Sequence, residues 1–261
     1  MKNDAYLIKL EKKILDIGIK KGSSVIICAD VLKLMIILKK EKINFSPNDF
    51  IDLMIKIIGK KGTLIFYSFN WGFFNGKIFN HSLSKSFSGA LSNAALERKD
   101  FKRSKSPVYS LLVYGKYQKK ICSMNHYNCF SLKSPFGFLI KKKVKCFLFD
   151  LDYKNGAFPF FHVAEQYEKV YYRFFKVFTG KIMIRNVLKK ISIKMFVRKN
   201  DYKITTIYSS KTDTELKKIN ALKKSSFFNI KISLLDVSKL YLMTLQQLKI
   251  EKKMILRRKS Q

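Results

Sequence analysis

The chain has 261 residues, 47% of them hydrophobic, which is enough for one substantial core. Its 53 Lys and Arg against 18 Asp and Glu give a formal charge of +35, and only seven of the basic residues are Arg, so the excess is almost entirely lysine. The lysines are scattered along the chain, whereas specific nucleic-acid binders depend on arginine forks, so the composition argues against a specific nucleic-acid partner. A positive surface would still attract phosphorylated small molecules.

Helical and strand-like patterns alternate along the first 70 residues. A capping serine, a proline in the first turn and an acid three residues on mark a helix start at Ser46, and that helix ends at Gly59. The expected elements are a helix over 4–17, a strand over 23–28, a helix over 31–40 that Asp30 opens, a helix over 47–58 and a strand over 64–69. This order is typical of an α/β sheet.

The same patterns continue to the end of the chain, with no linker rich in Pro, Gly or Ser and no internal repeat. The expected elements are a helix over 89–98 capped by Ser88, strands over 108–115, 144–151, 191–198, 204–208 and 228–234, a polar helix over 213–224, a closing helix over 236–253 and a frayed basic tail over 254–261. The sequence therefore predicts one α/β domain spanning residues 1–261.

Cysteine usage and hydropathy predict the compartment. Cys28, Cys122, Cys129 and Cys146 follow no CxxC pattern, and the N-terminus has no secretory apolar region. We therefore expect free thiols in a reducing cytoplasm. The most apolar stretch, 25–38, contains charged residues and is shorter than the ~18 apolar residues that a membrane span needs.

Among the three histidines, one lies in a context that suggests catalysis. His162 and Glu165 are three residues apart in PFFHVAEQYE, so on a helix they share a face. A carboxylate there could orient the imidazole or raise its basicity, as a general base requires. The same spacing also occurs in ordinary surface pairs, so spacing alone leaves both interpretations open. His81 and His126 lie in polar loops and are expected to be solvated.

Several other classes of site are excluded by missing motifs. No second His, Cys or acid lies at metal-ligand spacing from any of the histidines, which argues against a zinc site. The chain contains no GxGxxG, no GxxxxGK[ST] and no GxSxG, so a dinucleotide fingerprint, a P-loop and a hydrolase elbow are all absent. What remains is an enzyme-like domain with one candidate base.

Six segments, in order along most of the chain, resemble the aminoglycoside 3-N-acetyltransferase family. They are GSSVIICADVLKL (22–34), GTLIFYSFNW (62–71), SGALSNAALER (88–98), KRSKSPVYSLLVYG (102–115), SPFGFL (134–139) and FFHVAEQ around His162. The resemblance implies a single domain with a mixed central sheet flanked by helices, distinct from the GCN5-related fold. It also implies transfer of acetyl from acetyl-CoA to a sugar amine without a metal.

The resemblance assigns roles to the HxxE segment. The family's functional histidine falls on His162, which would remove a proton from the substrate amine as its nitrogen attacks the thioester. The matching acid is Glu165, which would hold the ring and stabilise the imidazolium. Together they are the predicted catalytic pair.

The resemblance also places CoA against the turn after the first strand, at Asp30 and Val31, and against the loop that carries Ser104, Ser106 and Ser110. Helix N–H groups near Asp30 would receive part of the pantetheine or phosphate. N–H groups or hydroxyls of the serine loop would stabilise the thioester oxyanion. For each serine, the alternative is a role in a turn or a cap.

Three positions depart from the family pattern. The turn over 28–30 is Cys-Ala-Asp where the family has His-Ser-Ser, Ser106-Pro107 replaces His-Pro, and Pro159 stands at a threonine-like position. An acid near CoA phosphates would repel them, so Asp30 is expected either to face away or to position the amine. These changes leave open a divergent member of the family without catalytic activity.

The acceptor is predicted from charge and from two further segments. VYYRFFK (170–176) and KMFVRKNDYK (194–203) are closer to relatives in surface-polysaccharide sugar biosynthesis than to drug-resistance enzymes. An aminoglycoside is a polycation and needs an acid-lined cleft, whereas a nucleotide-linked amino sugar suits a positive one. We therefore expect the nucleotide-linked amino sugar, with an aminoglycoside as the alternative acceptor.

The alternative of another class is a basic, non-catalytic protein that binds RNA or anionic lipid. This alternative predicts lysines on one continuous face. The oligomeric state stays open.

Overall fold

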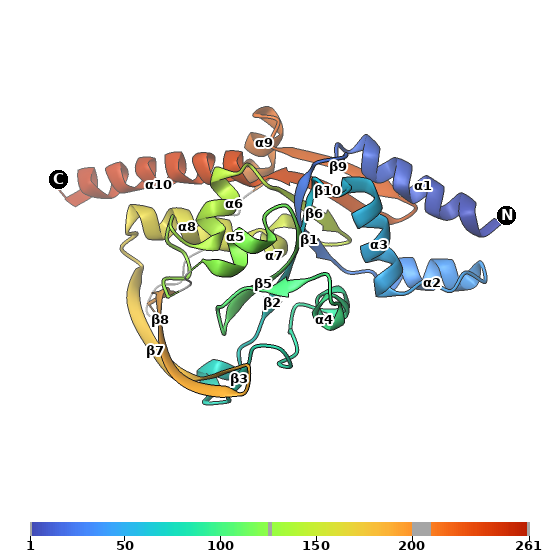
Figure 1. The fold of residues 1–261 in the computed structure, drawn as a ribbon. Coiled ribbons are helices and arrows are strands. Elements are labelled where there is room, and N and C mark those ends of the chain that lie inside the picture. Colours follow the sequence, from blue (N-terminus) through green and yellow to red (C-terminus); the bar gives the residue numbers. More distant parts are fainter. Residues whose placement is uncertain (1, 125–126, 200–209, 260–261) are drawn as a thin grey trace.

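A seven-stranded mixed sheet forms the centre of the molecule. The computed structural model describes residues 2–124, 127–199 and 210–259 (Figure 1). The strand order is β4-β5-β2-β1-β6-β10-β9, in which β1 pairs in parallel with both β2 and β6 and the other pairs are antiparallel. The strands are β1 (Ser24–Ala29), β2 (Thr63–Phe69), β4 (Lys102–Arg103), β5 (Tyr109–Gly115), β6 (Lys145–Phe149), β9 (Leu222–Phe227) and β10 (Ile230–Asp236). The expectation of a mixed central sheet is confirmed.

Alternate side chains of the central strands enter two different cores. In β1, Val25 and Ile27 belong to one core, while Ile26 and Cys28 belong to the other. Because the parallel strands are apolar on both faces, each face needs a layer of helices. One layer holds α1 (Lys2–Asp16), α2 (Leu32–Lys40), α3 (Pro47–Ile58) and α4 (Ala90–Glu97); the other holds α5 (Gln118–Ser123), α6 (Pro135–Lys141), α7 (Tyr153–Gly156), α8 (Phe158–Glu168), α9 (Ser210–Lys218) and α10 (Val237–Lys259) (Figure 1).

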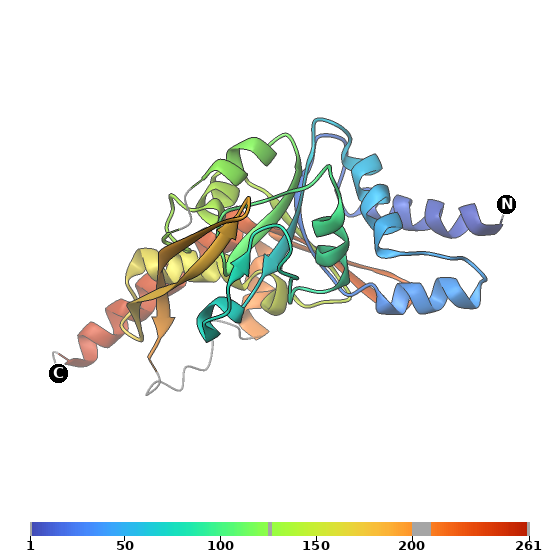
Figure 2. The ribbon, with the colours of Figure 1, turned by 60° about the horizontal axis from the view of Figure 1, so that its bottom comes forward.

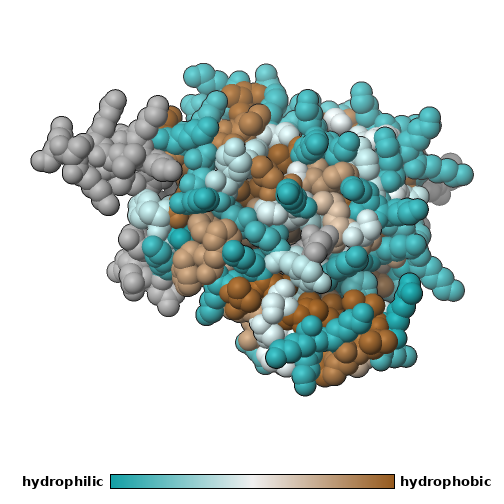
Figure 3. Space-filling view, turned by 60° about the vertical axis from the view of Figure 1, so that its left-hand side comes forward, coloured by the Kyte–Doolittle hydropathy of each residue, from teal (hydrophilic) through white to brown (hydrophobic). Residues whose placement is uncertain are grey.

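A second, three-stranded sheet extends from the main body (Figures 1 and 2). It consists of β3 (Phe79–Asn80), β7 (Arg173–Ile184) and β8 (Val187–Arg198), and the short helix η1 (Gly72–Asn75) packs against it. Arg185 and Asn186 both have positive φ at the tip, as a two-residue hairpin turn requires. Figure 3 shows hydrophobic side chains gathered at the lower end of the molecule, where Figure 1 places this hairpin.

The first half of the chain folds largely as its patterns predict. The capping box of α3 is present, because the Asp49 N–H donates to Ser46 Oγ at 3.3 Å and the Ser46 N–H donates to Asp49 Oδ2 at 2.7 Å. The predicted Ser88 cap is wrong. Gly89 is the N-cap of α4, and the Ser88 hydroxyl instead accepts a hydrogen bond from the Phe69 N–H at 3.2 Å, which draws it toward the end of β2.

The second half needs several corrections. The polar helix predicted over 213–224 ends at Lys218, because Leu222 already pairs with Leu235 across the β9–β10 hairpin. The closing helix continues to Lys259, beyond the predicted end at 253. Strand β7 was not predicted at all. The predicted strand over 204–208 and His126 lie outside the described residues. No helix in the described ranges is long and apolar enough to span a membrane.

Candidate active site

The topology places several loops at one edge of the sheet. Strands β1, β2 and β6 run parallel, so their carboxyl ends meet at that edge. Strand β1 lies between the other two, and the chain passes to β2 on one side of it and later to β6 on the other, so the connections diverge at the end of β1. Such a crevice is where open α/β sheets bind their ligands. Helix α8 follows β6 through the single turn of α7 and brings His162 to this region.

Helix α8 holds His162 and Glu165 on one face, as their spacing predicts. His162 Nδ1 lies 2.6 Å from Glu165 Oε2. The carboxylate is held from two more sides, because the Tyr172 hydroxyl donates to Oε1 at 3.0 Å and Arg173 Nε lies 2.9 Å from Oε2. The His162 side chain is 20% exposed and that of Glu165 only 6%, so this is not an ordinary surface pair.

The surroundings set the charge states of the pair. Burial lowers the pKa of His162, and the Arg173 charge lowers it further, although the hydrogen bond and charge of Glu165 oppose both. Burial raises the pKa of Glu165, but its bonds to His162 and Tyr172 and the Arg173 charge outweigh that effect and leave the pKa below its usual value. At neutral pH the pair is therefore a neutral imidazole beside a carboxylate, the state that a general base needs.

Aromatic rings flank the imidazole. Phe130 and Phe158 meet it edge to face, with ring centroids 5.1 and 5.7 Å away. Pro159, which replaces a threonine-like residue, occupies the first turn of α8, where its missing N–H and fixed φ are tolerated. The two rings thus exclude water from parts of the imidazole surface, which strengthens the electrostatic interaction of the imidazole with Glu165.

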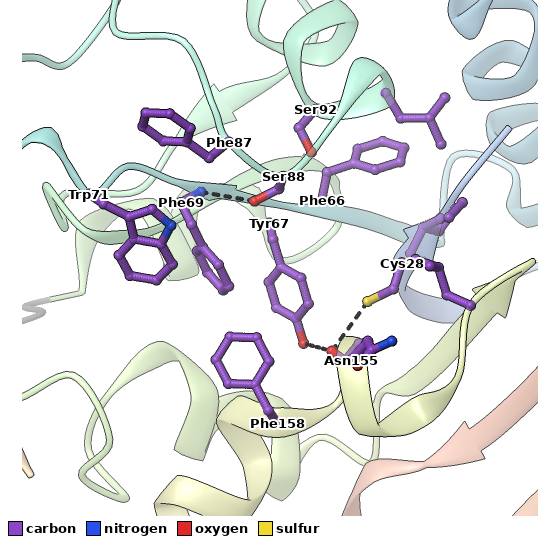
Figure 4. Close-up of a pocket in the computed structure, with 15 residues that line it drawn as sticks. Cys28, Phe66, Tyr67, Phe69, Trp71, Phe87, Ser88, Ser92, Asn155 and Phe158 are labelled. Carbon is purple, nitrogen blue, oxygen red and sulfur yellow. Dashed lines mark hydrogen bonds between the residues drawn. The ribbon is translucent and has the colours of Figure 1, made fainter. Parts of the chain in front are cut away.

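A cavity of about 200 Å³ lies beside this pair, between the ends of β1 and β2 and helices α4 and α7 (Figure 4). The Tyr67 hydroxyl and the Cys28 thiol both donate to the Gly156 carbonyl, at 2.7 and 3.3 Å. A Cβ at Gly156 would lie 2.8 Å from the Cys28 Cβ, so only glycine fits there. Phe158 lines the cavity and also packs on His162, which places the cavity one side chain away from the base.

Cys28 is the one thiol on the wall of this cavity among its described lining residues. Its Sγ lies 3.8 Å from that of Cys146. Burial raises the pKa of Cys28 well above its usual value, and the neighbouring Cys146 adds to the effect. A protonated thiol is a poor nucleophile, so Cys28 is suited to packing rather than to an acyl-enzyme step. All four cysteines are free.

Two further cavities adjoin the first. One, of about 590 Å³, brings Asp30 and Val31 together with the start of α4 at Gly89. The other, of about 470 Å³, lies between η1 and the loop before α4 and is lined in part by Lys77. Phe87, which is 68% exposed, lines all three cavities and stands at their junction.

The Asp30 carboxylate occupies the start of α2 itself. Its Oδ1 accepts a hydrogen bond from the Leu32 N–H at 2.9 Å. One of the N–H groups that was expected to receive pantetheine or phosphate is therefore already bonded within the protein. The start of α4 differs, because its N-cap Gly89 provides no side chain to cap the helix.

Ser104, Ser106 and Ser110 are fully buried and build the loop that carries them. The Ser104 and Ser106 hydroxyls accept hydrogen bonds from the Leu111 and Tyr109 N–H groups, at 2.8 and 2.9 Å. The Ser110 hydroxyl donates to the Ser68 carbonyl. None of the three serines lines the cavities described above, so their contact with a cofactor stays a prediction. Their hydrogen bonds show a role in the turns of the loop.

Sequence patterns gave no sign of the buried Arg103. Its guanidinium donates to Ser110 Oγ at 3.0 Å, to the Ser84 carbonyl at 2.6 Å and to the Ser68 carbonyl at 3.1 Å, and it lies 4.6 Å from the Phe79 ring centroid. Burial lowers the pKa of Arg103 to about 10, which leaves it charged at neutral pH. It ties β2, β4 and β5 to the loop that leads to Phe87.

Within the described parts of the chain, no group of three or more His, Cys, Asp or Glu side chains could hold a metal ion. Sequence patterns also missed Tyr67, Tyr172 and Arg173, which complete the surroundings of the site. Tyr172 and Arg173 lie in VYYRFFK, which was singled out only for its likeness to relatives. The available signal was that they follow Glu165 closely in the sequence, just beyond the end of α8 at Glu168.

Comparison with known proteins gives the class of the chain. Residues 39–249 match the family model described as aminoglycoside 3-N-acetyltransferase, which covers most of the chain. The chain therefore belongs to this family and is an N-acetyltransferase. Comparison with curated proteins gave no match.

Solved structures share the fold across nearly the whole chain at low sequence identity. The complex of AAC-IIIb with CoASH is 14% identical with a TM-score of 0.77, covering 94% of this chain and 96% of that one. The aminoglycoside acetyltransferase AAC(3)-Xa is 13% identical with a TM-score of 0.75, covering 92% and 91%. The YokD protein from Bacillus subtilis is 15% identical with a TM-score of 0.72, covering 92% and 97%. The expected fold is confirmed.

Proposed function

We propose that the chain transfers acetyl from acetyl-CoA to the amine of an amino sugar, with His162 as the general base. One observation carries this proposal: an imidazole, bonded through Nδ1 to a buried carboxylate, stands one side chain away from the cavity at the carboxyl end of β1. Glu165 acts as a positioning residue, and Tyr172 and Arg173 hold it in place.

The proposed reaction uses the two nitrogens of the ring differently. Nδ1 carries the proton and donates a hydrogen bond to Glu165. The lone pair of Nε2 is therefore available to the substrate. The neutral sugar amine attacks the thioester carbonyl, and its N–H proton passes to Nε2 of His162 as the C–N bond forms. The tetrahedral intermediate collapses with cleavage of the C–S bond, and His162 returns the proton to the departing thiolate. The Glu165 carboxylate stabilises the transient imidazolium.

The donor is proposed to enter through the cavity lined by Asp30, Val31 and the start of α4. This cavity shares Ala29, Ser88 and Leu91 with the one beside His162, so a long, thin pantetheine could pass from one to the other. The uncapped N–H groups of α4 support placement of an anionic group there. AAC-IIIb, a protein of the same fold, is known in a complex with CoASH.

The acceptor is proposed to be an amino sugar linked to a nucleotide. No Asp or Glu occurs between Leu53 and Leu96, the segment that supplies the whole described lining of the cavity of about 470 Å³ and about half of the lining of the other two, in which Asp30 is the one acid. A polycationic acceptor would find few carboxylates there, whereas a diphosphate would meet lysines. An aminoglycoside is the second candidate, because the family carries that name and AAC-VIa binds sisomicin.

Release of free thiol from acetyl-CoA in the presence of an amine acceptor tests the proposal. The His162→Ala variant is expected to lose activity by about 10²- to 10⁴-fold. The matched control is His81→Ala, because His81 lines none of the three cavities and the variant keeps the backbone carbonyl that accepts from the Arg103 guanidinium. Undiminished activity of His162→Ala, with folding confirmed by circular dichroism, would refute the assignment of the base.

A further inference from the structure

We infer that the cavity between η1 and the loop before α4 binds a nucleoside diphosphate, the anionic part of the acceptor. This inference rests on the proposed function, because it assigns a binding site to the diphosphate part of the proposed acceptor, which lies away from the reacting amine. The cavity has a volume of about 470 Å³, within the range of small-molecule sites. It is lined by Asn70, Trp71, Gly72, Asn75, Lys77, Ile78, Ser84, Lys85 and Phe87.

The charge of this wall selects for an anion. Lys77 and Lys85 are its only charged residues, and within the described chain neither forms an ion pair with a carboxylate. The Asn70 side chain donates to the Lys85 carbonyl at 2.8 Å and fixes the loop that carries this lysine. Two ammonium groups on one small cavity provide the point charges that phosphate oxygens bind.

The same wall offers flat apolar surfaces. Trp71 is 36% exposed. Two other rings hold it in place: it stacks on Phe74 with ring planes 13° apart, and it meets Tyr109 edge to face with ring centroids 5.3 Å apart. Phe87, in the same wall, is 68% exposed. Bases stack on such rings, so an aromatic wall beside two lysines fits a nucleotide better than an inorganic anion.

The position of the cavity suits an acceptor rather than an isolated effector. Trp71 and Phe87 also line the cavity next to His162 (Figure 4). A molecule with its diphosphate at Lys77 and Lys85 can therefore extend its sugar past these two rings toward Phe158 and the base. The proposed donor cavity shares only Phe87 with this one, so the two substrates would approach His162 from different directions.

Coenzyme A also contains a nucleoside diphosphate, so the test must distinguish the two sources. Trp71 is the only tryptophan in the chain, and its fluorescence reports on this cavity and on the adjoining cavity next to His162, both of which it lines. The probes are UDP, dTDP, GDP and CDP, each titrated into the full chain, and CoASH in a parallel titration. The variant is the double substitution Lys77→Gln and Lys85→Gln. The control is Lys60→Gln with Lys61→Gln, which removes the same charge at the turn before β2, at the opposite end of that strand.

At least one of the four nucleotides is expected to change the Trp71 fluorescence. Relative to the natural chain, its Kd should rise about tenfold or more in the double variant and change by less than about twofold in the control. The Kd for CoASH is expected to change by less than about twofold in both. The inference is overturned if no nucleotide binds, if the double variant binds it equally well, or if CoASH loses as much affinity. His162→Ala should bind the nucleotide normally, so failure of the proposed base and failure of this site give different results.

Discussion

His162 Nδ1 and Glu165 Oε2 lie 2.6 Å apart on one face of α8, with the carboxylate almost completely buried. The bond fixes which nitrogen of the ring carries the proton. It also leaves the lone pair of the other nitrogen, Nε2, for a substrate. The orientation of the base is therefore set within a single helical turn.

Glu165→Gln is expected to lower kcat by about 10²- to 10⁴-fold while the protein stays folded. A glutamine amide can donate to Nδ1, which would move the proton to Nε2 and remove the lone pair that accepts the substrate proton. The control is Glu168→Gln on the same helix, which leaves the pair with His162 intact and should keep near-normal turnover. Thiol release at saturating acceptor measures both variants. Equal kcat values for the two variants would contradict the positioning role.

The titration of His162 is expected to have its midpoint below the ordinary value of 6.5, because burial disfavours the imidazolium. Proton NMR of the imidazole resonances measures it directly, and the signal that His162→Asn removes identifies the residue. A midpoint above 6.5 would contradict a buried, neutral base.

The same shift makes stability depend on pH. The folded chain binds the His162 proton less tightly than the unfolded chain, so the contribution of this group to stability is complete above pH 6.5 and is lost as pH falls through the lower folded pKa. Urea unfolding at several pH values should show a smaller loss of stability on acidification in His162→Asn than in the natural chain. Identical losses would mean that the pKa of His162 is not shifted by folding.

Asp30→Asn is expected to lower the KM for acetyl-CoA by about two- to fivefold, because an acid at the entrance of the proposed donor cavity repels the phosphates. Asparagine can still accept the hydrogen bond from the Leu32 N–H, so the start of α2 should be kept. Asp152→Asn is the matched control, since Asp152 caps α7 in the same way by accepting from the Lys154 N–H. An unchanged KM in Asp30→Asn, measured at low ionic strength, would place the phosphates elsewhere.

Arg103→Leu is expected to lower the free energy of unfolding by about 2–4 kcal/mol, because it removes the guanidinium donor from the Ser84 carbonyl and one of the donors from the Ser68 carbonyl, which also accepts from the Ser110 hydroxyl. Arg98→Leu, which removes the ion pairs of a partly buried guanidinium with Asp52 and Asp100 near the surface, should cost less, about 1 kcal/mol. Chemical denaturation of both variants gives the comparison. Similar costs would show that the buried hydrogen bonds of Arg103 contribute little.

The elements that sequence predicts well are those whose signals are local. The capping box at Ser46 and Asp49 needs only four residues, and the parallel strands are continuous apolar runs because both of their faces are buried. The spacing of His162 and Glu165 likewise fixes their geometry once a helix forms. Each of these features follows from a few neighbouring residues.

The features that sequence missed depend on residues far apart in the chain. Strand β7 has no regular alternation, since half of its residues are exposed, four of them in a row, and Phe174 and Val177 face solvent. Ser88 resembles a helix cap until the Phe69 N–H competes for its hydroxyl. Arg103 looks like one more basic residue in a chain of 53, and only the folded sheet reveals that it is enclosed.

The order of the strands has a consequence for biosynthesis. Helix α8 carries the base, but it packs against α10, and the edge of the sheet beyond β6 consists of β10 and β9 from the C-terminal part of the chain. A nascent chain therefore carries His162 well before the ribosome has produced the segments that cover it. Until those segments emerge, the apolar surfaces of β6 and α8 remain available to chaperones and to other chains, and folding has to wait for contacts of long sequence separation. Translation that stops short of β9 would leave a polypeptide with every proposed reacting group and no finished enzyme.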